Sequence, residues 1–126
     1  MRLVIALAVA SAATAMAIGS VAAQSQMELN AQAGSDLRKS DAQLNAVYNK
    51  LRAKISEAGK KSLQTAQQSW LRFRDQECEF ETMGTVGGSI HSMIMAICLT
   101  RLTDQRIKDL EAQLNCQEGN LSCGGQ

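Results

Sequence analysis

The residues that could carry chemistry gather in one stretch, ECEFETMGTVGGSIHSMIMAICLT (residues 77–100). It contains two of the four cysteines, Cys78 and Cys98, and the only histidine of the chain, His91. A zinc site needs cysteine and histidine ligands at tetrahedral spacing, often with a close CxxC pair. Cys78 and Cys98 are twenty residues apart and no second histidine exists. We therefore expect no metal site and no cofactor.

Enzymatic residues are also not expected. A catalytic cysteine needs a neighbouring base and a lowered pKa. His91 is near in sequence, but in an oxidising compartment a thiol with an available partner tends to form a disulfide. A glycosidase needs two carboxylates with separate roles across a cleft, whereas the acidic series alternates around a helix (Asp75, Glu77, Glu79 and Glu81). The pattern predicts no catalytic residue and a protein that is not an enzyme.

Three helices must position these residues. Apolar side chains recur at spacings of three, four and seven over residues 35–59, 62–84 and 89–114, which is typical of amphipathic helices. Ser35, Ser62 and Ser89 are the expected N-caps, and Gly59 and Gly84 the expected ends of the first two helices. The predicted core stripes are Leu37, Leu44, Tyr48, Leu51 and Ile55; Leu63, Ala66, Trp70, Phe73 and Phe80; and Ile90, Ile94, Ile97, Cys98, Ile107, Leu110 and Leu114.

The fold class follows from these helices and their connectors. No segment alternates like a strand, and the predicted connectors, residues 59–61 and 84–88, are short. Short connectors make consecutive helices antiparallel neighbours. The sequence predicts an all-α fold, a small antiparallel three-helix bundle stapled by disulfides, with an irregular tail at residues 116–126.

Helix geometry favours a disulfide between the second and third helices. At about 1.5 Å per residue, Cys78 lies roughly 9 Å before Gly84 and Cys98 roughly 13 Å after Ser89, so their heights in an antiparallel hairpin differ by about one turn. Cys116 and Cys123 would then pair in the tail. Four cysteines allow three connectivities, and the sequence leaves the other two open.

The first 23 residues have the pattern of a cleaved signal peptide. Arg2 precedes an apolar, Ala-rich run over residues 3–18, and small residues follow at 21–23. The alternative is a membrane anchor, because uncharged residues reach nearly span length. We expect cleavage before Gln24, a periplasmic or secreted protein, and no stable membrane anchor afterwards. The domains predicted are residues 1–23, 24–115 and 116–126.

The mature chain is predicted to be electrically neutral. Removing Arg2 from 13 basic residues leaves 12, against 12 acidic residues. A neutral surface of mixed sign has no electrostatic footprint for nucleic acid or an anionic membrane. Any partner must be recognised by local shape and chemistry, and nucleic acid is not an expected partner.

Two groups of residues are candidate binding sites. Gly88, Ser89 and His91 lie at the predicted start of the third helix, where glycines allow a sharp turn. If a disulfide holds this tip rigid, the tip can enter a partner's cleft with a smaller loss of conformational entropy. The alternative is that His91 is an ordinary surface histidine. Trp70 and Arg74 are four residues apart and can form a cation–π pair. The alternative there is a core tryptophan with a charged collar.

Three segments carry a family resemblance. AQQSWLRFRDQECEFE (66–81), GGSIHSMIMAICLTRLTDQRIKDLE (87–111) and DAQLNAVYNKL (41–51) resemble the lysozyme inhibitor LprI-like N-terminal domain family. The resemblance covers roughly residues 27–115. It implies a small helical domain exported to the bacterial envelope, Cys78 and Cys98 as a structural pair, and a lysozyme as the partner. Unlike the family's namesake lipoprotein, this chain has no lipidation cysteine directly after the apolar run.

The sequence thus favours two functions from different classes. The first is a binding protein that inhibits a host-type lysozyme, as the resemblance implies. The second is a structural or adaptor protein of the bacterial envelope without inhibitory activity, which the same bundle and neutral surface would serve equally well.

Overall fold

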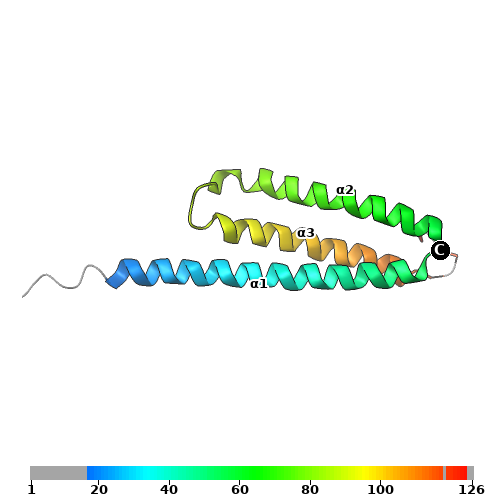
Figure 1. Ribbon diagram of the computed structural model, residues 1–126, viewed down its shortest axis with the longest axis horizontal. Coiled ribbons are helices and arrows are strands. Elements are labelled where there is room, and N and C mark those ends of the chain that lie inside the picture. Colours follow the sequence, from blue (N-terminus) through cyan, green and yellow to red (C-terminus); the bar gives the residue numbers. More distant parts are fainter. Residues whose placement is uncertain (1–16, 118, 125–126) are drawn as a thin grey trace, which may run out of the picture.

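The computed structural model describes residues 17–117 and 119–124 (Figure 1). Three α-helices follow one another as α1 (Ala17–Lys54), α2 (Glu57–Glu81) and α3 (His91–Leu114), and a short 3₁₀ helix, η1 (Met83–Thr85), lies between α2 and α3. Figure 1 shows α1 and α3 running in the same direction and α2 in the opposite one. The described residues contain no strand, so the predicted all-α, up–down–up bundle is confirmed.

The predicted first connector is wrong. The chain turns at residues 55–56, and Gly59 lies inside α2. Ser56 is the N-cap, because its hydroxyl accepts a hydrogen bond from the Gly59 backbone N–H at 3.2 Å. A serine here satisfies one of the free donors of the first turn, and Glu57 places a negative charge at the positive end of the helix dipole. Ser62, the predicted cap, is an internal position.

Two other predicted caps are also wrong. Helix α1 continues through Gly34 and Ser35 and begins inside the segment predicted as a leader. Residues 1–16 of that segment lie outside the described residues. Helix α3 begins at His91, with Ile90 in helical geometry at the cap position and no side chain as a cap. The Ser89 backbone is instead held by α1, because its carbonyl accepts a hydrogen bond from Asn30 Nδ2 at 3.0 Å.

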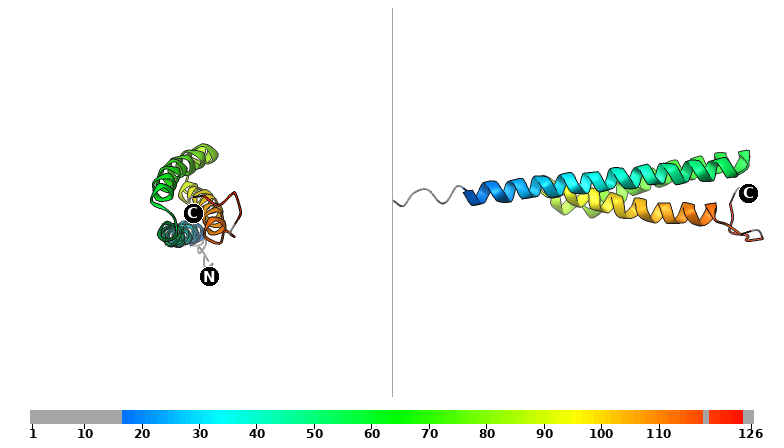
Figure 2. Two further views of the ribbon diagram at one scale, coloured as in Figure 1. Left: turned by 90° about the vertical axis from the view of Figure 1, so that its right-hand side faces the viewer. Right: turned by 90° about the horizontal axis from the view of Figure 1, so that it is seen from below.

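The core lies between α1 and α3, in the half of the bundle remote from η1. Its buried members are Leu44, Val47, Leu51, Ile55, Ile107 and Leu110, and Tyr48, Leu63, Trp70 and Leu114 pack around them. Helix α2 contributes only partly buried side chains to this cluster. The two views in Figure 2 show α1 and α3 side by side, with α2 on one side of the pair. The bundle is therefore a tight α1–α3 pair with α2 laid against it.

The predicted stripes place four large side chains wrongly. Phe73, Phe80, Ile90 and Ile97 were expected in the core, but they are 52%, 70%, 40% and 52% exposed. The buried residues of α2 are instead Gly59, Gln67 and Cys78. Consecutive helix positions are about 100° apart, so Phe80, two positions after the buried Cys78, lies on nearly the opposite side of α2 and faces outward. The rotation of α2 follows its disulfide and the contacts of Trp70 and Arg74 rather than the predicted stripe that contains Phe73 and Phe80.

No helix in the described part of the chain is both long and apolar enough to cross a membrane. The tail from Asn115 to Gly124 consists of turns and irregular backbone where it is described, as predicted.

Candidate functional site

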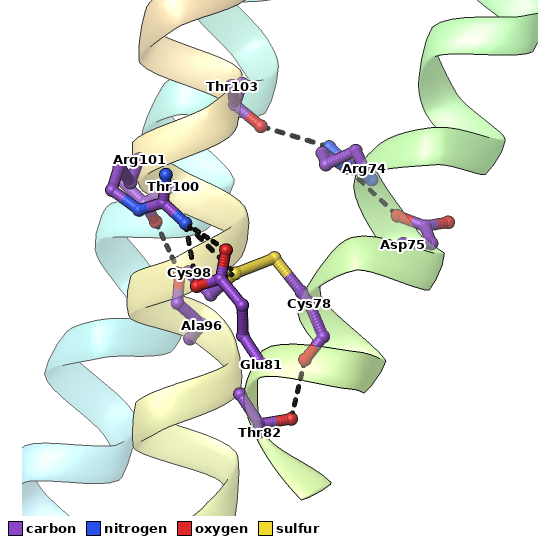
Figure 3. The surroundings of a disulfide bond; sticks show 10 residues. All are labelled: Arg74, Asp75, Cys78, Glu81, Thr82, Ala96, Cys98, Thr100, Arg101 and Thr103. Carbon is purple, nitrogen blue, oxygen red and sulfur yellow. Dashed lines mark hydrogen bonds and ion pairs between the residues drawn. A yellow bond between two sulfur atoms is a disulfide. The ribbon is translucent and has the colours of Figure 1, made fainter.

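A disulfide joins α2 to α3 just below their connector. Cys78 and Cys98 are bonded, with their Cα atoms 5.7 Å apart, and both are buried. Figure 3 shows the bond bridging the two helices. Cys116 and Cys123 form the second disulfide, which closes a small ring in the tail. Both predicted pairings are confirmed, and the chain has no free cysteine.

Polar contacts surround the first disulfide. Arg101 Nη2 of α3 lies 2.7 and 2.8 Å from the two carboxylate oxygens of Glu81 at the end of α2 (Figure 3). The Thr82 hydroxyl donates to the Cys78 carbonyl at 2.7 Å, so it satisfies an acceptor at the helix terminus. The covalent bond and these contacts together fix the spacing of the two helices where the connector begins.

The connector is a chain of successive turns. Backbone hydrogen bonds run from Thr85 N–H to the Thr82 carbonyl, from Gly88 N–H to the Thr85 carbonyl, and from His91 N–H to the Gly88 carbonyl. Gly87 has a φ of 82°, a conformation that costs a residue with a side chain more than glycine. The connector is therefore a defined local structure rather than a loose loop.

His91 closes this connector from within. Its Nδ1 lies 2.8 Å from the Thr85 hydroxyl oxygen, and that hydroxyl donates to the Thr82 carbonyl at 2.8 Å. The hydroxyl proton is thus used, so the contact requires His91 Nδ1–H as the donor. Nε2 is the remaining ring nitrogen and can bind an outside group. His91 is half-buried, whereas Gly88 and Ser89 are exposed.

The connector also carries exposed apolar side chains that the sequence analysis did not identify as a surface. Phe80, Met83, Val86 and Ile90 are all exposed, and Val86 and Phe80 most strongly. We call residues 80–91 the connector end. One feature of the sequence could have revealed this surface: apolar residues continue after the end of the second helix, at Met83 and Val86, where no further helix covers them. Large exposed apolar side chains in one place are typical of interaction surfaces.

The second candidate pair, Trp70 and Arg74, lies between the helices. The guanidinium carbon of Arg74 is 5.4 Å from the centre of the Trp70 ring, and that of Arg106 from α3 is 5.8 Å from it. Arg74 also binds Asp41 of α1 at 2.9 Å and Thr103 of α3 at 3.1 Å. Its side chain is only 12% exposed. These contacts link all three helices, and Trp70 packs at the core far from the connector end.

Arg106 is held in a similar way. Its Nε donates to the Gln67 side-chain oxygen at 3.0 Å. Partial burial lowers the pKa of its guanidinium, and nearby Asp109 acts in the opposite direction. A guanidinium nevertheless stays charged at neutral pH, so Trp70 lies between two cations. This arrangement orients α2 on α3 and leaves Arg74 few polar atoms for a partner.

The described residues contain no group of three histidine, cysteine, aspartate or glutamate side chains able to hold a metal ion.

Comparison with known proteins places the chain in a family. The model of the family described as "Lysozyme inhibitor LprI" matches residues 18–110. The chain belongs to the LprI family. It is also 32% identical, over 109 residues, to an uncharacterized protein of Rhizobium meliloti (strain 1021), with 76% of this chain and 78% of that protein covered. No solved structure matches the chain.

The LprI match includes all of α2, the connector, and α3 as far as Leu110. Cys78, Cys98 and the connector end therefore lie within the family's region, and the Cys116–Cys123 ring lies beyond it. The family is described by inhibition rather than by catalysis. Two disulfides are typical of proteins from oxidising compartments outside the cytosol, which agrees with the extracellular or periplasmic setting of an LprI protein.

Proposed function

We propose that this protein is exported from the bacterial cell, loses residues 1–23, and inhibits a lysozyme by inserting its connector end into the enzyme's cleft. The observation that carries the proposal is the LprI match over residues 18–110. That match covers every residue of the connector end.

The chemistry of the connector end suits such a cleft. A lysozyme cleft is lined by two catalytic carboxyl groups. The connector end offers them two kinds of hydrogen-bond donor, the Ser89 hydroxyl and the backbone N–H groups at the start of α3. His91 Nε2 is an acceptor for a carboxyl group that carries its proton. The N-terminus of a helix also carries partial positive charge. Phe80, Met83 and Val86 give the connector end exposed apolar surface that binding would remove from water.

The connector end is also braced before any partner arrives. The Cys78–Cys98 bond and the Glu81–Arg101 pair hold its base. The bonds from His91 to Thr85 and from Asn30 to Ser89 hold its backbone. Ordering a flexible loop costs binding free energy, so a loop that is already held binds more tightly for the same contacts.

The test is an inhibition assay with the oxidised, exported protein. Increasing amounts are added to a vertebrate-type lysozyme acting on cell-wall substrate, and the concentration for half-inhibition is measured. The double variant Ser89→Ala, His91→Ala is expected to inhibit at least about tenfold more weakly, equivalent to about 1.4 kcal/mol. A matched control, Ser69→Ala with Arg72→Ala, changes an exposed hydrogen-bonded pair on α2 and should inhibit like the natural protein.

Two results contradict the proposal at different levels. Equal potency of the double variant and the natural protein would exclude Ser89 and His91 of the connector end as the contact. If a large molar excess of folded protein leaves lysozyme activity unchanged, this LprI member is not an inhibitor of that enzyme. An adaptor role in the envelope would then be the better explanation.

A further inference from the structure

An open groove lies between α1 and α3. It has a volume of about 620 Å³ and is formed by side chains of these two helices alone. Its apolar part consists of Leu29 and Ala33 from α1 and Met93 and Ile97 from α3. The right-hand view of Figure 2 shows α2 behind the α1–α3 pair, so α2 leaves this side open.

The groove carries exposed apolar side chains on both helices. Leu29 of α1 is 50% exposed and Ile97 of α3 is 52% exposed. Two packed helices with an open apolar groove resemble half of a four-helix bundle, in which a second pair would cover the groove.

The register across the groove is regular. The Ser40 hydroxyl donates to Asp104 Oδ1, which sets residue 40 of α1 beside residue 104 of α3. The two helices run in the same direction, so moving back along both keeps this offset of 64 residues. Leu29 then stands level with Met93, Ala33 with Ile97, and Asp36 with Thr100 and Arg101.

We propose that the groove is the interface of a parallel, two-fold symmetric dimer, and that its occupant is a second copy of this chain. A two-fold axis running along the groove exchanges the two helices, so α1 of each copy lies on α3 of the other. The register then pairs Leu29 with Met93 of the second copy and Ala33 with Ile97 of the second copy. Such an interface is isologous, since every contact occurs twice.

The charged residues along the groove support a second copy of the chain as its occupant. Asp36 lines the α1 edge of the groove and Arg101 lines the α3 edge, at nearly the same height. Exchanging the edges by the two-fold axis brings Asp36 of each copy to Arg101 of the other. Arg101 uses Nη2 for Glu81 in its own chain, so its other nitrogens can serve the second copy. The neutral mature chain, with 12 basic and 12 acidic residues, adds no net repulsion between copies.

The size of the groove indicates how tightly the dimer should associate. Eleven residues of each copy line it, fewer than the roughly 20–30 residues a side of a stable interface. We therefore expect a dimer that dissociates at micromolar concentrations. Because the axis runs along the helices, both connector ends lie at the same end of the dimer. The proposal does not depend on lysozyme inhibition.

The test is sedimentation equilibrium of the oxidised, exported protein between about 10 µM and 1 mM. Ile97→Asp places two carboxylates in the interface and should weaken the dimer at least about tenfold. Phe73→Asp is the matched control, because Phe73 on α2 is also 52% exposed but lies outside the groove. It should leave dimerisation unchanged. Both positions are half exposed, so both variants should fold.

A charge exchange tests the register. Asp36→Arg should weaken the dimer by setting arginine against Arg101, and adding Arg101→Glu should restore it at least in part by reversing both edges. A protein that is monomeric at about 1 mM overturns the proposal, and it leaves the groove to another partner. A dimer unaffected by Ile97→Asp, or one that the charge exchange fails to rescue while the helical signal persists, overturns this interface.

Discussion

Removing the disulfide between α2 and α3 should cost this protein a large share of its stability. The Cys78–Cys98 bond closes a loop with a sequence separation of 20 residues. In the chain-entropy model, opening a loop of about twenty residues returns roughly 11 cal/mol/K to the unfolded chain, or about 3 kcal/mol at 25 °C. Both sulfur atoms are buried, so replacing both cysteines by alanine also removes packed atoms. We expect a loss of at least about 3 kcal/mol.

The tail disulfide provides an internal comparison. Its sequence separation is 7, which by the same model corresponds to about 2.4 kcal/mol if the ring unfolds together with the bundle. The ring touches the bundle mainly through Gln113, whose side chain binds the Ser122 carbonyl and the Gly124 N–H. Because no core residue depends on it, most of this free energy is local. The pair Cys116→Ala, Cys123→Ala should lower bundle stability by less than about 1 kcal/mol.

The assay is urea unfolding followed by the helical circular-dichroism signal, with both double variants and the natural protein under oxidising conditions. At about 4–8 °C per kcal/mol for a domain of this size, the first variant should also melt at least about 12 °C lower. Equal losses from the two pairs would refute the reasoning, because they would mean that the tail ring belongs to the cooperative core. A loss below about 1 kcal/mol from the first pair would refute the entropic estimate itself.

Three further predictions test the helices and the export of the chain. Ser56→Ala should destabilise the protein by about 0.5–2 kcal/mol, because the Gly59 N–H loses its acceptor; Ser62→Ala, inside α2, should change the urea midpoint much less. Leu51→Ala should cost about 2–5 kcal/mol in the same measurement, since Leu51 lies in the α1–α3 core. Protein recovered from its bacterial host should have the intact mass of residues 24–126 with both disulfides formed, and a mass that retains residues 1–23 in the membrane fraction would indicate an anchor instead.

Local patterns in the sequence determined the helical class of this protein and favoured the cysteine pairs that the structure contains. Helical periodicity depends on neighbours three and four residues apart, so three helices could be predicted without knowing their packing. The heights of Cys78 and Cys98 in an antiparallel hairpin followed from helix rise alone. The cation–π pair of Trp70 and Arg74 likewise needed only a spacing of four residues, and the structure contains it.

The helix boundaries were harder to predict from the sequence. Ser56 and Ser62 are both good N-caps by residue type, and Gly59 resembles a helix end. The choice between them depends on the burial of Ile55 in the core beside Leu51, because Ile55 is the first residue of the turn and Ser56 follows it directly. That position is set by contacts with α3, which lie more than fifty residues further along the chain.

Only the tertiary structure decided which surfaces of this LprI protein remain open. The rotation of α2 exposes Phe73 and Phe80 because Cys78 is tied to α3. The contact of Asn30 with Ser89 spans 59 residues, and the Ser40–Asp104 bond that sets the groove register spans 64. A stripe of apolar residues shows that a helix has a buried side, but how far that side turns, and what it meets, depends on packing between segments that no local spacing relates.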